Sequence, residues 1–351
     1  MLLCAVLRQR VSIEQNPEMV TREHFGALPD GTPVDIITIR NAPGFELSAL
    51  TYGCLIVAVK VPDADGKALN VVLGYDGLEP YLHSSPYFGA LVGRFANRIA
   101  NATFVIDGRP YSVSRNEGSN HVHGGVKGFD KHVWHAETDP RKNAVRFRRR
   151  SPDGEEGYPG TLDVEVTYSL GDLDDVSMTC EAVTDAPTHV NLTQHSYFNL
   201  RGDGDVLSYL LTIDASTYLP VGGNLIPTGE RRPVSNTPFD FREPCAIGAR
   251  IGDDDEQLRM PGGYDHAFVL NRGGADLALA ARISDPFSGR ALEVSTTEPS
   301  LQLYSGQVVG YRGLCLEPQH FPDSPNRPEF PSTLLRPGER YRSVTRYTFS
   351  T

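Results

Sequence analysis

The sequence lacks several features that mark common classes of protein. Its 351 residues include only five cysteines, and none of them form a Cys-x-x-Cys pair. An odd number of scattered cysteines argues against both a disulfide framework and a zinc knuckle. No apolar run approaches the roughly 20 residues of a membrane span, and the apolar run at the N-terminus is too short for a signal peptide. We therefore expect no membrane partner and a reducing, cytoplasmic location.

Basic residues are also scarce. The chain has 44 acidic and 33 basic residues, which gives a formal net charge of −11. Its one basic run, Arg146 to Arg150, is interrupted by Phe147. A nucleic-acid partner would need a broad patch that neutralises phosphates, so we expect none. We interpret the arginines as the solvated edge of a sheet, where charge discourages pairing with other chains.

Alternation of apolar and polar residues is the dominant pattern that is present. Residues 161–170 alternate strictly, and residues 176–182 repeat the pattern after a turn-rich connection, so the two segments predict a hairpin. The pair Asp107-Gly108 favours a two-residue turn and predicts a second hairpin between residues 103–106 and 109–113. Further strands are expected at residues 35–40, 55–61, 69–73, 144–148, 190–193, 210–213, 277–283, 301–304, 314–316 and 343–349.

The sequence shows strand periodicity but little helical periodicity. Amphipathic helices of three turns or more are absent from the pattern, and the 34 glycines and 26 prolines are spread without a low-complexity linker. We therefore predict an all-β fold, a large antiparallel β-sandwich. It is expected to form a single domain over residues 1–351, in which residues 1–30 are an N-terminal extension or the first strands.

Two histidines one residue apart, His121 and His123, pose a choice between metal chemistry and metal-free proton chemistry. On a strand they would project from the same face and could share a metal or line a pocket. A cupin metal site needs a glutamate soon after the second histidine, but the first acid is Asp130. Glu317 and His320 are further candidates, yet their spacing on a strand points them to opposite faces. We expect no metal, and a cupin-like metalloenzyme stays an alternative.

Glu317 ends an apolar strand, with its carboxylate on the same face as Cys315. Pro318 is expected to stop the strand from continuing in a central position of a sheet. Desolvation raises the pKa of a carboxyl group and makes its carboxylate a stronger base. The pattern therefore fits a catalytic base in a cleft, and it fits a salt bridge at the end of a strand equally well.

A polar stripe precedes a pair of aromatic residues in the middle of the chain. His189, Asn191, Thr193 and His195 fall on one face by period two, an arrangement that suits a polyhydroxylated ligand better than a core. Imidazole is also the side chain best suited to donate a proton near neutral pH. A structural role for these histidines is the alternative.

Two further segments carry groups that can hold hydroxyls. Asn97 and Arg98 stand side by side and offer directional donors for vicinal hydroxyls. Asp265 opens an apolar strand and can accept hydroxyl protons. Taken alone, these residues fit a capping amide, a surface arginine and a turn aspartate as well.

In combination, these motifs resemble the aldose 1-epimerase, or galactose mutarotase, family. The resemblance runs from about residue 30 to the C-terminus in the family's motif order. It implies a large antiparallel β-sandwich with an open sugar-binding cleft. The matching segments are residues 93–100, 123–125, 128–131, Trp134, 191–200, 264–266, 301–306, 316–317, 321–326 and 335–339.

The resemblance also implies a mechanism. Glu317 would be the general base that takes the proton of the anomeric hydroxyl, and His195 the general acid that protonates the ring oxygen. The partner would be a small monosaccharide such as D-galactose or D-glucose, no cofactor would be needed, and the protein would be a monomer or homodimer. The substrate hydroxyls would be held by Asn97, Arg98, His123, Asp265 and Gln302, with His123 close to the reacting centre.

Two other functions stay open on the same fold. One is a noncatalytic sugar-binding or regulatory protein, against which the joint presence of Glu317 and His195 argues. The other is a hexose-phosphate mutarotase, which would need a cationic cluster at the cleft. Arg231, Arg232 and Arg242 are the candidates for such a cluster.

Overall fold

The predicted all-β class is confirmed. The computed structural model describes residues 19–351 except 42–43, 64–65, 84–85, 172–173 and 273–275. Every pair of named strands within this part of the chain is antiparallel. The two α-helices among the described residues, α1 (Glu79–His83) and α2 (Glu256–Arg259), are single turns. Neither has the length and apolarity that a membrane crossing requires.

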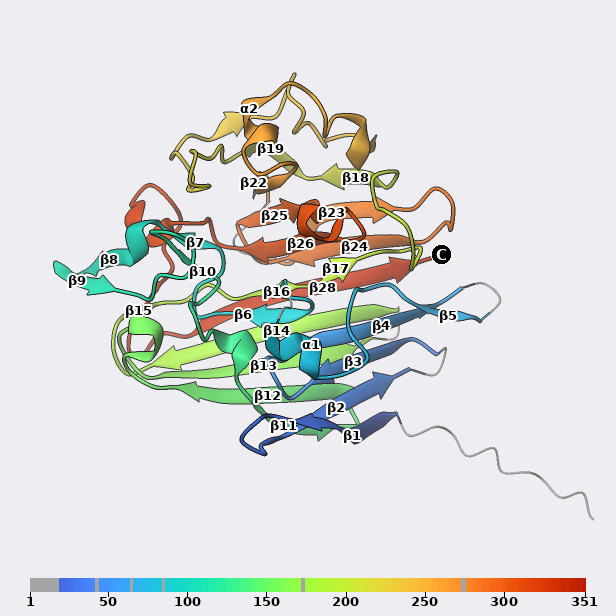
Figure 1. Ribbon diagram of the computed structural model, residues 1–351, viewed down its shortest axis with the longest axis horizontal. Coiled ribbons are helices and arrows are strands. Elements are labelled where there is room, and N and C mark those ends of the chain that lie inside the picture. Colours follow the sequence, from blue (N-terminus) through green and yellow to red (C-terminus); the bar gives the residue numbers. More distant parts are fainter. Residues whose placement is uncertain (1–18, 42–43, 64–65, 84–85, 172–173, 273–275) are drawn as a thin grey trace, which may run out of the picture.

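Three large sheets contain most of the strands (Figure 1). In spatial order, the five-stranded sheet consists of β1 (Val20–Ala27), β2 (Pro33–Arg40), β3 (Glu46–Leu50), β4 (Ile56–Pro62) and β5 (Ala68–Asn70). The nine-stranded sheet consists of β11 (His135–Asp139), β12 (Ala144–Ser151), β13 (Leu162–Leu170), β14 (Asp175–Thr184), β28 (Tyr341–Ser350), β24 (Ala291–Thr296), β23 (Ala278–Ser284), β18 (Leu210–Ile213) and β21 (Cys245–Ala246). The six-stranded sheet consists of β17 (Tyr197–Phe198), β26 (Leu314–Gln319), β25 (Ser300–Tyr304), β22 (Asp265–Leu270), β19 (Ala215–Tyr218) and β20 (Arg232–Pro233).

Smaller elements join these sheets. The two-stranded pairs are β6 (Ala90–Val92) with β16 (Thr193–His195), β7 (Arg98–Ile99) with β10 (His121–Val122), β8 (Thr103–Ile106) with β9 (Arg109–Ser112), and β15 (Thr188–His189) with β27 (Leu334–Leu335). The short 3-10 helices are η1 (Ala100–Ala102), η2 (Phe129–Lys131), η3 (Glu155–Gly157), η4 (Ile247–Ala249), η5 (Gln307–Val309) and η6 (Ser324–Asn326).

The large sheets pack face to face around a common core, so the predicted sandwich is confirmed. The largest cluster of buried side chains includes Ile39 of β2, Val166 of β13 and Leu303 of β25, one residue from each large sheet. In Figure 1 the five-stranded sheet in blue overlaps β12–β14 in green. Apolar side chains from different sheets that share one core stabilise both layers by excluding water. The cluster extends from β2 to β28, which agrees with the prediction of a single domain; that prediction stays untested.

Both predicted hairpins are present. Asp107 and Gly108 have φ angles of 51° and 78° and form the turn between β8 and β9. Such positive φ values at both central positions are those of the turn that the Asp-Gly pair favours. The alternating segments form β13 and β14, which pair along their whole length from Leu162↔Thr184 to Leu170↔Val176.

Several predicted strands differ from the observed ones. Residues 190–192 lie between β15 and β16 instead of in one strand. There Asn191 forms an isolated parallel bridge with Phe95, and its side chain bonds to the carbonyls of Ala96 and His320 and to the amide of His320. Strand β5 ends at Asn70, so only part of the segment 69–73 is a strand. Of the N-terminal 30 residues, 20–27 form β1; residues 1–18 lie outside the described residues.

The interpretation of the basic run as a sheet edge is wrong. Strand β12, which carries these arginines, lies between β11 and β13. Arg148 pairs with Glu165 at 2.9 Å and Arg150 with Asp163 at 2.7 Å, in both cases on the neighbouring strand. The run is charged because the outer face of the sheet carries cross-strand ion pairs.

Strand β26 also continues where an end was expected. Pro318 lies within it, opposite Leu301 of β25. Its carbonyl accepts a hydrogen bond from the Thr193 hydroxyl at 2.7 Å, so the side of Pro318 that lacks an N–H faces away from β25. The proline therefore costs no ladder bond between β25 and β26.

Candidate active site

A cavity of about 280 Å³ lies between the six-stranded sheet and the short β6–β16 and β7–β10 pairs. It brings together six of the seven predicted site residues, from five separate segments of the chain. Gln302 lines a smaller adjoining pocket that shares Asn97, Arg98 and Asp265 with this cavity, and its amide donates to Asp265 Oδ1 at 2.6 Å. The predicted residues that line the cavity are Asn97, Arg98, His123, His195, Asp265 and Glu317.

Strand register places the acidic side of the cavity. Glu317 on β26 is directly opposite Gln302 on β25, and Gln302 is opposite Ala267 on β22, two residues after Asp265. Cross-strand neighbours share a face of the sheet, so these side chains converge. Cys315 points the same way as Glu317, as alternation predicts, because both face His195.

Glu317 and His195 form a buried pair. Glu317 Oε1 lies 3.7 Å from His195 Nε2, while Glu317 Oε2 is buried without a hydrogen-bond partner. Burial raises the pKa of Glu317 well above its usual value; the Asp265 carboxylate raises it further, and Arg98 opposes this shift. Burial lowers the pKa of His195 to about 4. Both shifts disfavour charge, so burial favours the uncharged pair, in which the shared proton is on Glu317 and His195 is a neutral imidazole.

The surroundings of His195 fix its ring. Cys315 Sγ lies 3.5 Å from His195 Nδ1, on the edge of the ring away from Glu317. The His195 carbonyl accepts the Gly89 amide at 3.1 Å. The neighbouring Gln194 donates to the Gly89 carbonyl at 2.6 Å and accepts from Tyr168 at 2.8 Å. These bonds hold β16 against β6 and direct Nε2 toward Glu317.

The opposite side of the cavity is built from turns. Asn97 and His123 have left-handed backbone conformations, with φ angles of 63° and 51°. His123 Nδ1 accepts the Asn97 amide at 3.3 Å, so the ring hydrogen of neutral His123 is on Nε2, from which it can be donated to a ligand. Burial, aided by His195, lowers the pKa of His123 and keeps the ring neutral.

His121 and His123 do not share a face, because β10 ends at Val122. His121 is buried between the Tyr158 hydroxyl, 2.7 Å from Nε2, and the Ser114 carbonyl, 2.7 Å from Nδ1. It therefore supports the loop, and His123 alone faces the cavity. The break between β15 and β16 likewise corrects the predicted polar stripe: of its four members, only His195 lines the cavity, and His189 instead bonds to Thr333.

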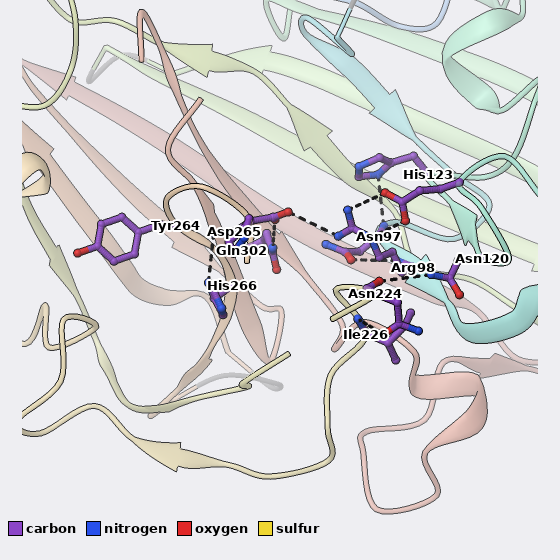
Figure 2. A network of polar contacts seen from close by, with 12 residues as sticks. Asn97, Arg98, Asn120, His123, Asn224, Ile226, Tyr264, Asp265, His266 and Gln302 are labelled. Atoms are coloured by element: carbon purple, nitrogen blue, oxygen red, sulfur yellow. Dashed lines mark hydrogen bonds and ion pairs between the residues drawn. The ribbon is translucent and has the colours of Figure 1, made fainter. Parts of the chain in front are cut away.

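Arg98 is held between two carboxylates. Glu117 accepts from Arg98 Nε at 2.7 Å and from Nη2 at 2.8 Å, and Asp265 Oδ2 lies 3.5 Å from Nη1. Figure 2 shows Asp265 between Arg98 and Gln302, with ion-pair and hydrogen-bond contacts to both. Burial raises the pKa of Asp265, and Arg98 opposes this shift. The array is therefore rigid before any ligand enters.

Sequence reasoning missed several residues that line the cavity. Tyr87 packs against His123, with ring centres 4.8 Å apart, and Tyr197 against His195 at 5.2 Å. Tyr304 completes the aromatic wall. Tyr197 and Tyr304 lie within segments 191–200 and 301–306, which match motifs of the family. By contrast, no local sequence pattern indicates that Tyr87 or Glu117 lines a site.

One group of possible metal ligands occurs among the described residues. The nearest ligand atoms of His195, Cys315 and Glu317 lie within 4.8 Å of one another. However, His195 faces Cys315 with Nδ1 and Glu317 with Nε2. A single ion binds one ring nitrogen, so this orientation fits proton transfer at Nε2 better than joint coordination.

The fold and the cavity together fit a sugar-processing β-sandwich enzyme that works by proton transfer. Comparisons with proteins of known family support this class. The sequence model of the aldose 1-epimerase family matches residues 35–348. The chain is 44% identical over 348 residues to galactose mutarotase of Homo sapiens, covering 94% of this chain and 98% of that one. It is 39% identical over 336 residues to aldose 1-epimerase of Escherichia coli K12, covering 92% and 96%.

Solved structures give the same result. Galactose 1-epimerase from Lactobacillus acidophilus matches with a TM-score of 0.83 and 30% identity, covering 94% of this chain and 98% of that one. The aldose epimerase homologue from C. elegans matches with a TM-score of 0.82 and 30% identity, covering 90% and 98%. The chain belongs to the aldose 1-epimerase family. It is accordingly an isomerase that acts on carbohydrates and interconverts anomers.

Proposed function

We propose that the chain interconverts the α and β anomers of free aldoses such as D-galactose and D-glucose, with Glu317 as general base and His195 as general acid. The observation that carries this assignment is the buried, unpaired Glu317 Oε2 in a cavity where Oε1 lies 3.7 Å from His195 Nε2. A buried polar atom without a partner is rare and is available to a substrate hydroxyl.

The pair can open the sugar ring without a net change of protonation. Glu317 takes the proton of the anomeric hydroxyl, the C1–O5 bond breaks, and its electron pair goes to the ring oxygen, which takes a proton from His195. Rotation about C1–C2 in the free aldehyde exposes the other carbonyl face, and reversal of the two proton transfers closes the ring. Ring opening starts from the Glu317 carboxylate and the His195 imidazolium and leaves both groups uncharged, so the two residues share one proton throughout. The burial that disfavours both charges therefore favours the two proton transfers. A positioned acid or base each contributes typically about 10²–10⁴-fold.

The remaining predicted residues would hold the sugar. His123 offers Nε2–H near the reacting centre, and Arg98 and Asp265 offer a donor and an acceptor for neighbouring hydroxyls. Gln302 Oε1 is buried without a hydrogen-bond partner, although its amide nitrogen is bonded to Asp265. Asn97 supplies the backbone amide that sets the His123 tautomer, and its side chain lines the cavity.

The proposal favours free sugars over sugar phosphates. The three candidate arginines for a phosphate site have other contacts: Arg232 pairs with Glu230 at 2.7 Å, Arg242 pairs with Asp240 at 2.7 Å, and Arg231 stacks on Phe321. None of them lines the cavity described above.

A cytoplasmic location and a monomeric or homodimeric state also remain part of the proposal. Among the described cysteines, Cys54, Cys180 and Cys315 are buried free thiols and Cys245 is a partly buried one. Free thiols persist in reducing compartments, which supports the location.

Polarimetry on freshly dissolved α-D-galactose, α-D-glucose, α-D-xylose and L-arabinose tests the function. Purified protein should accelerate the approach to anomeric equilibrium well above the spontaneous rate for at least one of these sugars, with no added cofactor. Binding without acceleration would identify a noncatalytic sugar-binding protein instead. Metal analysis of the same preparation, with assay after chelation, tests the metal-dependent alternative.

A further inference from the structure

Glu117 is an acidic residue of the cavity wall to which the proposed mechanism gives no task. It lies in the turn before β10, with 38% of its side chain exposed, and its carboxylate forms a two-point contact with Arg98, whose side chain is 11% exposed. The contact distances, 2.7 Å to Nε and 2.8 Å to Nη2, are those of a bidentate arginine–carboxylate pair.

This contact occupies the part of Arg98 that binds anions best. The Nε–Nη2 edge of a guanidinium matches the geometry of a carboxylate or a phosphate. In this cavity Glu117 already fills that edge, and only Nη1 is directed at Asp265. An anionic group of a ligand would therefore have to displace a carboxylate that belongs to the protein.

The charges around the cavity act in the same direction. Its charged lining residues are Arg98, Glu117, Asp265 and Glu317. The Glu317–His195 pair is neutral when it holds one proton, so two carboxylates face one guanidinium and the cleft has a net negative charge. Lys131 lies near the wall, 5.3 Å from the Tyr87 ring centre, but it is paired with Asp130 at 3.0 Å.

We propose that Glu117 is a specificity-determining residue that makes the site select uncharged aldoses over sugars that carry a carboxylate or phosphate. It does so by occupying the anion-binding edge of Arg98 and by keeping the cleft negative. This inference rests on the proposed function, because it concerns the substrate class of the same site. It does not depend on where the sixth carbon of the sugar lies, because the repulsion between charges acts across the whole cleft.

The test compares D-galactose with D-galacturonate, which has the same ring stereochemistry and a carboxylate at the sixth carbon. The kcat/KM of each sugar is measured by polarimetry and the Kd by calorimetry, for the wild-type protein and for Glu117→Gln. Glu117→Asp retains the charge with a shorter reach. Glu230→Gln is the matched control, because Glu230 forms the same two-point contact with Arg232 away from the cavity.

The wild-type protein should prefer galactose, and Glu117→Gln should reduce that preference about tenfold, which corresponds to one charge interaction of moderate strength. Glu117→Asp should retain most of the preference, and Glu230→Gln all of it. An unchanged preference in Glu117→Gln, or a wild-type protein that uses both sugars equally, would overturn the inference.

The two measurements separate this inference from the proposed function. If the protein accelerates anomer exchange of galactose but Glu117→Gln prefers galactose over galacturonate as strongly as the wild type does, the role of Glu117 is refuted. The proposed mutarotase function is then unaffected. The opposite outcome is also possible. If the wild-type protein binds galactose more tightly than galacturonate, Glu117→Gln loses this preference, and neither accelerates anomer exchange, the role of Glu117 is supported and the catalytic proposal is refuted.

Discussion

The two sides of the cavity are built in different ways. His195, Asp265, Gln302 and Glu317 stand on strands β16, β22, β25 and β26, where the register of the sheets determines which side chains converge. Across the cavity, Asn97 and His123 are in left-handed turns, and Arg98 begins a two-residue strand held by Glu117.

This difference separates the proposed tasks. The strand side carries the acid–base pair, whose atoms must lie at fixed distances, and paired strands within a packed core resist displacement. The turn side carries residues that are proposed to hold the hydroxyls of the sugar. The positions of these residues depend on local hydrogen bonds and on glycine conformations. Changes on the strand side should therefore affect chemistry, and changes on the turn side should affect binding and local stability.

The largest effect is expected from Glu317→Gln. The amide keeps the shape of the side chain but cannot take the anomeric proton, so kcat/KM for galactose should fall by about 10³-fold. Polarimetry measures the loss, and circular dichroism checks the fold. Glu298→Gln is the matched control, since Glu298 is also buried beside a histidine, His320, at 2.7 Å. A loss of less than about tenfold in Glu317→Gln would refute its role as the base.

On the turn side, Gly124→Ala should raise KM more than it lowers kcat. Gly124 has φ 85°, and an added Cβ would lie 1.8 Å from the Gly93 carbonyl oxygen. The turn that presents His123 must therefore shift, and we expect a loss of about 1–3 kcal/mol of stability. Thermal unfolding and steady-state kinetics measure the two effects. Gly108→Ala is the control, with φ 78° and open space around the new Cβ; if both variants behave alike, the close contact is unimportant.

The smallest effect is a gain in stability that depends on pH. Burial raises the pKa of Glu317 in the folded protein above its value in the unfolded protein. Between these two pKa values the folded state binds more protons than the unfolded state, so the folded protein loses stability as the pH rises. Glu317→Gln lacks this titration. Its free energy of unfolding should exceed that of the wild-type protein by about 1–2 kcal/mol at pH 8 and by less at pH 5. Denaturant unfolding at the two pH values measures this difference, and a gain that is larger at pH 5 contradicts the assigned shift.

Much of the strand side could be predicted from the sequence. Alternation correctly placed Cys315 and Glu317 on one face, because a regular strand repeats every two residues. Alternation failed at residues 190–192, where the Asn191 backbone pairs with Arg94 and Ala96 and its side chain bonds to Ala96 and His320. A period-two pattern carries no information about such tertiary hydrogen bonds.

The turn side was less accessible to sequence reasoning. His121 and His123 seemed equivalent because their spacing suits a strand, but the positive φ of His123 turns its side chain into the cavity. Glu117 had no signal at all, since a lone acid in a polar turn is common and its partner Arg98 is 19 residues away. The family resemblance located Arg98 and His123; the residues that hold them needed the structure.

The central claim is that Glu317 and His195 act as one proton-transferring unit, and a double-mutant cycle tests it most directly. The kcat/KM for galactose is measured for Glu317→Gln, His195→Asn and the double variant. Residues that act as a unit show strongly non-additive losses, because removal of either one already prevents the reaction. The double variant should therefore be within a few-fold of the worse single variant. Losses that multiply would show that the two residues contribute independently and would contradict the shared-proton mechanism.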